Sequence, residues 1–200
     1  MRADNDLRRA VFIDRDGTIN EDIGYVSSPE ELIVYPFAAQ AVRLVNQSEM
    51  KVIVITNQSG VARSLYTEQM LAAIHDRLTC ELALAHARID GIYYCPHHPE
   101  IGDETYRKAC ECRKPRPGLL LEAARDHQID LAASYVIGDK ASDINLAAEV
   151  GATGVLVLTG YGRQTLLGRG RPCSPAVVAD DLLEAVRVIL DRERVEDVRC

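Results

Sequence analysis

The sequence predicts an α/β fold, a doubly wound and mostly parallel sheet with helices on both faces. Five short runs rich in β-branched residues recur along the chain, at residues 10–14, 52–56, 92–95, 135–138 and 154–158. Four have the length and near-continuous apolarity of strands buried on both faces, and the run at 92–95 is the weakest. Segments with helical spacing separate these runs, and alternation of strand and helix is typical of a doubly wound sheet.

The helices of the first half follow the first two strands. A helix is expected over 37–47, because apolar residues recur three or four positions apart, at Ala38, Val42 and Val45. A second helix is expected after Thr67, because a threonine hydroxyl is a common N-cap and apolar residues continue with helical spacing as far as Leu82.

In the second half of the chain, residues typical of helix ends indicate where the helices begin and stop. Pro117 is expected to open a helix over 118–127, and Ser142 to cap one that ends at Val150, before Gly151. A last amphipathic helix is expected over 181–194. The sequence contains no internal repeat and no linker, so we expect a single domain over 1–200.

Composition and charge limit the class of partner. The 200 residues are 47% hydrophobic, which is enough for one substantial core. Lys and Arg number 23 and Asp and Glu 30, a net charge of −7 that disfavours binding to nucleic acid or to an anionic membrane. No apolar run approaches the ~20 residues that cross a bilayer. The charged start, MRADNDLRRA, lacks the apolar core of a signal peptide, so we expect a cytoplasmic protein.

Two aspartates follow the first predicted strand, in the motif DRDGT. Asp14 and Asp16 are two residues apart, so both lie on one face if the extended geometry continues. Neighbouring carboxylates repel each other unless a cation or a reaction partner stabilises them. A solvated turn explains an isolated motif of this kind equally well, but in open parallel sheets ligands bind beyond the carboxyl ends of the strands.

The ends of other strands carry complementary groups. The run TNQSG after the second strand offers hydroxyl and amide donors that suit phosphate oxygens, beginning with Thr56. The run GDKASD after the strand at 135–138 adds Asp139 and Asp143, which suit a hard cation such as Mg²⁺. Arg113 and Lys114 supply positive charge just before a helix. Taken singly, each run has an ordinary explanation as a polar turn or a basic loop.

Together and in this order, these motifs resemble the haloacid dehalogenase superfamily of phosphatases. The resemblance implies that Asp14 is the nucleophile that forms an aspartyl-phosphate and that Asp16 is the general acid and base. It also implies that Mg²⁺ is bound by Asp14, the main-chain carbonyl of Asp16 and Asp139, and that Thr56 and Lys114 hold the transferring phosphoryl group. For Asp143 two roles stay open, orienting its neighbours or capping a helix.

Cysteine and histidine predict a structural zinc site in a loop over residues 95–112. Thiolates and imidazole are preferred zinc donors, and four ligands close a tetrahedral shell; the candidates are Cys95, His97, Cys110 and Cys112. Disulfide pairing is the alternative, but it leaves His97 unexplained and needs an oxidising compartment. His98 is an alternative ligand to His97. The other cysteines, Cys80, Cys173 and Cys200, are expected to be packing or surface residues.

The predicted zinc-binding loop restricts the resemblance to fewer families within the superfamily. The runs DRDGTIN, GYV, TNQSGVAR, IYYCPHHP, CECRKPRPG and GDKASD are together similar to the D-glycero-D-manno-heptose 1,7-bisphosphate phosphatases, from residue 10 to about 162. That family removes the C7 phosphate, in the synthesis of nucleotide-activated heptose. The implied substrate contacts are Arg15, Asp22, Ile23, Gly24, Tyr25, Asn57, Gln58, Ser59, Arg113 and Lys140.

Other readings remain open at this stage. Histidinol-phosphate phosphatases share the acid pair and a zinc loop, although a cationic rim suits a doubly anionic sugar better than a substrate amine. A zinc-stabilised interaction module without activity is a further alternative. The intervals between motifs leave no room for a lid domain of ~50 residues, so we expect a capless enzyme. We also expect a monomer. We assign no role to residues 163–172.

Overall fold

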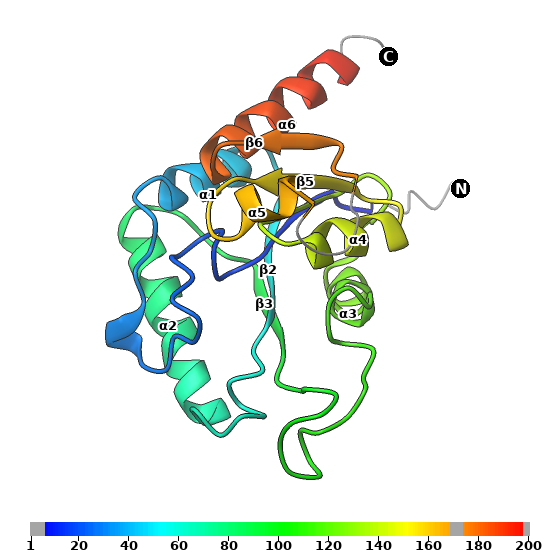
Figure 1. Cartoon of the computed structure of the whole chain (residues 1–200). Coiled ribbons are helices and arrows are strands. Elements are labelled where there is room, and N and C mark those ends of the chain that lie inside the picture. The colour runs from blue at the N-terminus through cyan, green and yellow to red at the C-terminus, as the bar shows by residue number, and fades with distance from the viewer. Residues whose placement is uncertain (1–6, 169–173, 198–200) are drawn as a thin grey trace, which may run out of the picture.

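The computed structural model describes residues 7–168 and 174–197, and it contains one parallel sheet of six strands in the order β3-β2-β1-β4-β5-β6 (Figure 1). The strands are β1 (Ala10–Ile13), β2 (Lys51–Asn57), β3 (Gly91–Cys95), β4 (Tyr135–Gly138), β5 (Thr153–Val157) and β6 (Val177–Ala179). The helices are α1 (Ala38–Gln47), α2 (Glu68–Leu84), α3 (Gly118–His127), α4 (Ala141–Glu149), α5 (Gly162–Leu166) and α6 (Leu182–Asp197), with a 3-10 turn, η1 (Pro29–Glu31). The predicted doubly wound parallel sheet is confirmed.

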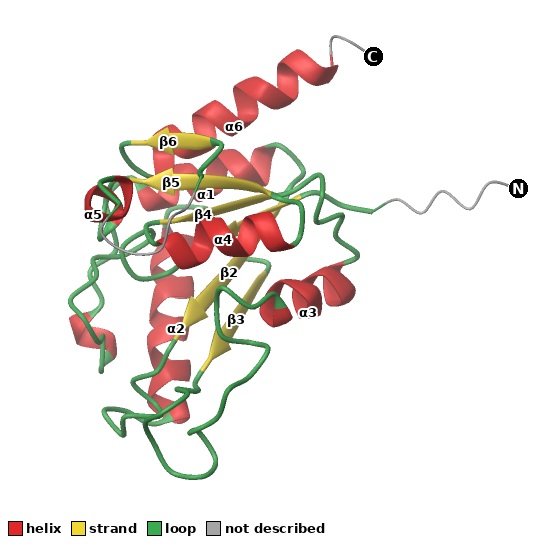
Figure 2. Cartoon of the chain, turned by 45° about the vertical axis from the view of Figure 1, so that its right-hand side comes forward, coloured by secondary structure: helices red, strands yellow, loops and turns green. Residues whose placement is uncertain are grey.

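Alternate residues of each central strand pack against opposite layers of helices. Val11 and Ile13 of β1 belong to a core shared with α1, α2 and α6. Phe12, between them, belongs to a second core shared with α3 and α4. Because successive side chains of a strand point to opposite faces, an uninterrupted apolar run is what such a two-sided core requires. Figure 2 shows α3 and α4 on the near face of the sheet and α1 behind it.

The structure departs from the expected elements in three places. Neither β6 nor α5 is predicted from the sequence, because they have only three and five residues, too few for a clear periodic pattern. The predicted cap at Ser142 is wrong, because Ser142 lies inside α4 and Lys140 occupies the N-cap position. The Asp143 side chain accepts a hydrogen bond from the Lys140 main-chain N–H at 3.1 Å and so completes the start of α4.

The order of the strands places the functional motifs side by side. The chain passes from β1 to β2 and β3 on one side, then returns to β4, β5 and β6 on the other. The crevice at such a reversal, beyond the carboxyl ends of the strands, is where open α/β sheets bind ligands. The loop between β3 and α3 extends past this edge (Figure 1). Among the described residues, every helix is too short or too polar to cross a membrane.

Candidate active site

Asp14 and Lys114 form the centre of the site. Asp14 follows β1 directly and is 5% exposed, and its Oδ1 lies 2.8 Å from the Lys114 ammonium. The same ammonium lies 2.7 Å from Oδ1 of Asp143 and donates to the main-chain oxygen of Ile55 at 3.0 Å. Burial disfavours the charged amine, but the two carboxylates outweigh burial and raise the pKa of Lys114. The lysine is therefore held as a cation beside Asp14.

Three buried carboxylates converge at this point. Asp14, Asp139 and Asp143 each offer an oxygen, and these oxygens all lie within 4.8 Å of one another. Burial and the neighbouring acids raise the pKa of Asp14, and they raise that of Asp139 to about 8. Oδ1 of Asp139 is buried without a hydrogen-bond partner, and its neighbour Lys140 Nζ is 3.9 Å away. An oxygen-ligated divalent cation fits this donor set, because it would satisfy that oxygen and offset the repulsion.

Gly17 lets the first loop approach Asp139 closely. Its φ is +86°, a conformation that favours glycine, and a Cβ added there would lie 2.3 Å from Oδ2 of Asp139. Gly160 approaches the same oxygen from the loop after β5, with an identical distance for an added Cβ. The main-chain N–H of Tyr161 donates to Oδ2 at 2.7 Å. Asp139 is thus fixed through one oxygen, while the other stays available.

Asp16 points into a separate polar network. Its carboxylate accepts three hydrogen bonds from Arg15, one from Asn20 at 2.9 Å and one from Gln58 at 2.8 Å. Burial raises the pKa of Asp16, but the charge of Arg15 and these donors outweigh it and lower the pKa below the usual range. The expectation that the Arg15 side chain contacts substrate is not supported, because that side chain is fully buried and directed at Asp16.

The polar run that begins in the last two residues of β2 makes most of its hydrogen bonds to groups inside the site. Thr56 is 1% exposed, and its hydroxyl accepts from the Gln58 amide at 2.8 Å. Asn57 accepts from the main-chain N–H of Lys114 at 3.0 Å and donates to its carbonyl at 3.2 Å. Gln58 is buried, and its side-chain amide forms hydrogen bonds with Asp16, Thr56 and Tyr66. Ser59 and Asn57 are half-buried and retain some access to solvent.

The loop over residues 22–25 spans the mouth of the site. Asp22 is paired with Lys140 at 2.8 Å on one side. On the other side, the guanidinium carbon of Arg63 lies over the Tyr25 ring, 5.8 Å from the ring centroid. Ile23 and Tyr25 are 49% and 41% exposed, so their side chains are available to a ligand. No role for Arg63 is predicted from the sequence, because nothing in its spacing points to Tyr25.

The four predicted zinc ligands come together. The sulfur atoms of Cys95, Cys110 and Cys112 lie 3.2 to 3.6 Å apart, and Nδ1 of His97 lies 3.2 Å from the Cys112 sulfur. Burial raises the pKa of the Cys95 and Cys112 thiols. Three thiols and one imidazole nitrogen within 4.8 Å fit a tetrahedral zinc ion, which would stabilise the thiolates. A single disulfide would leave one sulfur and His97 without a role.

The neighbours of this cluster connect it to Lys114, at the carboxyl ends of the strands. His98 is not part of it, because its ring accepts from the main-chain N–H groups of Glu100 and Ile101 at 3.1 Å. Arg113 donates to the main-chain oxygen of His97 at 3.1 Å, and Lys114 follows directly. Cys80 is exposed, as predicted, whereas Cys173 and Cys200 lie outside the described residues. Folding of the zinc loop therefore bears on the placement of both cations.

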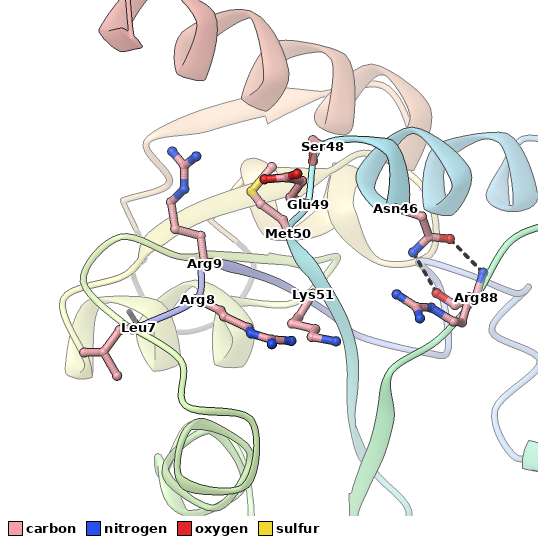
Figure 3. Close-up of a pocket in the computed structure, with 9 residues that line it drawn as sticks. All are labelled: Leu7, Arg8, Arg9, Asn46, Ser48, Glu49, Met50, Lys51 and Arg88. Atoms are coloured by element: carbon pink, nitrogen blue, oxygen red, sulfur yellow. Dashed lines mark hydrogen bonds between the residues drawn. The ribbon is translucent and has the colours of Figure 1, made fainter. Parts of the chain in front are cut away.

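Two hollows lie at opposite edges of the sheet. One of 440 Å³ borders Lys140 and is lined further by Pro115, Ser142, Asn145, Tyr161 and Gln164. The other, of 470 Å³, lies at the amino ends of β1 and β2 and is shown in Figure 3. Its cations are largely paired already, since Lys51 and Arg88 share Asp90 and Arg9 contacts Glu193. Of these two hollows, the one beside Lys140 adjoins the loop that carries Asp139.

A buried aspartate in contact with a lysine and a second acidic loop, at the switch point of a parallel sheet, are typical of a phosphatase of the haloacid dehalogenase type. A family model described as HAD-hydrolase-like matches residues 111–185. The chain is 44% identical over 153 residues to a D-glycero-beta-D-manno-heptose-1,7-bisphosphate 7-phosphatase of Photorhabdus laumondii, covering 76% of this chain and 81% of that one. It is 43% identical over 187 residues to a D-glycero-D-manno-heptose-1,7-bisphosphate 7-phosphatase of Thermosynechococcus vestitus, covering 91% and 95%.

A solved structure gives the same result. The crystal structure of D,D-heptose 1,7-bisphosphate phosphatase from B. bronchiseptica, complexed with magnesium and phosphate, superposes with a TM-score of 0.82 at 37% identity. The match covers 92% of this chain and 99% of that one. The chain therefore belongs to the D-glycero-D-manno-heptose-1,7-bisphosphate 7-phosphatase family. It is a hydrolase, and the predicted superfamily is confirmed.

Proposed function

We propose that this chain hydrolyses the C7 phosphate ester of D-glycero-D-manno-heptose 1,7-bisphosphate and releases heptose 1-phosphate. The observation that carries the proposal is the contact between Asp14 and Lys114 inside a cluster of acids, in a chain of this family. The carboxylate supplies a nucleophile, and the ammonium supplies charge where phosphoryl oxygens would lie. A non-catalytic module would have no need to bury such a set.

In the first step, a carboxylate oxygen of Asp14 attacks phosphorus while the bond between phosphorus and the C7 oxygen breaks. Asp16, after taking up a proton, donates it to the departing C7 oxygen, which leaves as a hydroxyl group. The pKa of Asp16 is lowered in the free protein, but an anionic phosphoryl group beside it favours proton uptake. The product of this step is an acyl phosphate on Asp14.

In the second step, water hydrolyses the acyl phosphate. Asp16, now ionised, accepts a proton from the water as the oxygen attacks phosphorus, and the carboxylate of Asp14 leaves. Inorganic phosphate is released and Asp14 is restored. Lys114 and the Thr56 hydroxyl contact the phosphoryl oxygens in both steps, so they stabilise charge in both transition states.

Magnesium is the cation that we assign to the acidic cluster. Asp14 and Asp139 would hold it through their side chains, and Asp16 through its main-chain carbonyl. The ion would neutralise negative charge on the transferring group. Asp143 is assigned a supporting role, because its oxygens are engaged by Lys114 and by the Lys140 main chain.

Zinc is assigned to Cys95, His97, Cys110 and Cys112. All four protein ligands are present, which leaves no open position for chemistry, so its role would be structural. Ligation would fold the loop that ends at Arg113 and Lys114. Because the reduced thiols of this site suit a reducing compartment, we place the enzyme in the cytoplasm.

The remainder of the substrate would lie between the loop over residues 22–25 and α5. Lys140 and Arg113 supply positive charge on the two sides of the site. The hollow beside Lys140 offers neutral hydrogen-bonding groups from Ser142, Asn145 and Gln164, which suit sugar hydroxyls. Direct contacts from Asp22, Tyr25 and Ser59 remain part of this proposal. We propose a monomer, which a light-scattering mass of about one 22.1 kDa chain would test.

Parallel kinetics test the proposal. The value of kcat/KM is measured with Mg²⁺ for both anomers of the heptose bisphosphate and for histidinol phosphate. We expect one or both heptose anomers to be strongly preferred and Asp14→Asn to be inactive on every substrate. A preference for histidinol phosphate would overturn the substrate assignment, and near-native turnover by Asp14→Asn would overturn the covalent mechanism.

A further inference from the structure

The Arg15 side chain is the main support of Asp16, and it is itself completely buried. Its Nε and Nη2 donate to the Asp16 carboxylate at 2.8 to 3.0 Å. Nη2 also lies 3.2 Å from Oε1 of Gln58. A buried guanidinium is stable only if its N–H groups find acceptors, so the remaining nitrogen, Nη1, needs a partner of its own.

His75 is that partner. It lies on α2, is 8% exposed, and its Nε2 is 3.2 Å from Nη1 of Arg15. Arginine has donors and no acceptor, so this contact requires an imidazole with an unprotonated Nε2. Burial, reinforced by the charge of Arg15, lowers the pKa of His75 to about 3. Both the geometry and the charge therefore describe a neutral ring that accepts from Arg15.

A second set of bonds fixes the other side of the arginine. Tyr66 donates to Oε1 of Gln58 at 2.6 Å, which leaves the amide nitrogen of Gln58 to face Asp16 and Thr56. The amide orientation is thus determined, and Arg15 is bound between two oriented side chains. Neither His75 nor Tyr66 touches the acidic cluster.

We infer that His75 is a positioning residue for general acid catalysis, acting on Asp16 through Arg15. The inference rests on the proposed role of Asp16 as the proton donor. Without His75, Arg15 loses one of its two lateral supports, so its three hydrogen bonds hold the carboxylate of Asp16 less firmly, while those from Asn20 and Gln58 remain. The nucleophile Asp14 and its partner Lys114 keep their own contacts, so the defect is confined to protonation of the leaving oxygen.

Leaving-group dependence tests this role. Values of kcat/KM, which report the first chemical step, are measured for a primary alkyl phosphate and for p-nitrophenyl phosphate. An alkoxide is a poor leaving group that needs the proton, whereas p-nitrophenolate leaves without it. For His75→Leu we expect roughly a tenfold or larger loss with the alkyl ester, and less than about twofold with the aryl ester. His75→Gln, whose amide oxygen can accept from Arg15, should recover most of the alkyl activity.

Two controls keep the outcomes distinct. His127→Leu removes a half-buried histidine whose ring packs edge-on against Tyr93, far from Asp16, and it should leave both activities unchanged. Nitrogen NMR of the wild-type chain should find His75 protonated on Nδ1 alone, whether or not His75→Leu folds. Parallel losses on both esters, no loss on either, or a proton on Nε2 would overturn the inference. Activity of Asp14→Asn would instead overturn the proposed mechanism.

Discussion

The Lys114 ammonium lies 2.8 Å from Oδ1 of Asp14 in a position that is 5% exposed. The same lysine contacts Asp143, so one cation balances two carboxylates at the carboxyl edge of the sheet. Removing one member of a buried charged set leaves the others uncompensated. The contact is consequently both a support for the nucleophile and a preformed site for phosphoryl charge.

Replacing this lysine should abolish most activity. For Lys114→Met we expect kcat to fall by about 10² or more, because a buried, preorganised charge is lost from the transition state. The measurement is phosphate release from p-nitrophenyl phosphate at saturating Mg²⁺. Lys51→Met, which removes a lysine paired with Asp90 at the opposite edge, is the control and should keep kcat. Similar rates for the two variants would contradict the assigned role.

Asn57 should matter through the main chain of Lys114. Its amide makes two hydrogen bonds to that residue, at 3.0 and 3.2 Å, so Asn57→Ala should lower kcat by roughly tenfold and cost about 1 kcal/mol of stability. Asn46 is a matched control, because it makes the same pair of bonds to Arg88, at 2.8 and 2.9 Å, far from the site. Asn46→Ala should lose comparable stability by urea unfolding and no activity. A drop in kcat for both would point to a general loss of rigidity.

The parallel sheet, and the gathering of the polar motifs at the carboxyl ends of its strands, could be predicted from the sequence for a simple physical reason. Parallel strands end at one edge, so residues that follow β1, β2 and β4 must gather there. Direction and burial of single side chains could not be predicted in the same way. Arginine is usually exposed on the surface, so the burial of Arg15 could not be predicted. Its partner His75 is 60 residues away on α2. Asp143 also combines both roles left open, since it caps α4 and binds Lys114.

Loss of the proposed zinc ion should reduce activity, although its assigned role is structural. For Cys112→Ser we expect the metal to be lost and kcat/KM to fall, because the loop that presents Arg113 and Lys114 would lose its cross-link. Metal content by atomic emission and turnover are measured on the same sample. Cys80→Ser, at an exposed position, should retain both. Full turnover by zinc-free protein would show that the loop folds without the ion.

Alanine variants of Gly17 and Gly151 distinguish the effect of backbone strain from the effect of displacing Asp139. Both Gly17 and Gly151 have positive φ, +86° and +74°, but an added Cβ meets Asp139 only at Gly17 and meets nothing within 4 Å at Gly151. Each alanine variant should lose about 1 kcal/mol or more of stability from strain. Only Gly17→Ala should also lose kcat, by at least about tenfold, because Asp139 has to move. Equal kcat values in the two variants would mean that Asp139 tolerates the shift.

His75 should make the fold sensitive to mild acid. Its pKa is lowered to about 3 by burial and by Arg15, whereas an unfolded histidine titrates near 6.5. Between these values the unfolded chain binds a proton that the folded chain does not, so stability falls as pH falls. From pH 7 to pH 5 this single group should remove about 2 kcal/mol of unfolding free energy, and His75→Gln should lack that part of the loss.

Urea unfolding of both chains at pH 7 and pH 5 measures the difference directly. The cysteine ligands and the acidic cluster are the same in both chains, so their contributions cancel when the two pH dependences are subtracted. The wild-type chain should therefore lose about 2 kcal/mol more than His75→Gln over this interval. Equal losses would show that His75 takes up a proton in the folded chain near its ordinary pKa. Such a proton on Nε2 is incompatible with its acceptor contact to Arg15.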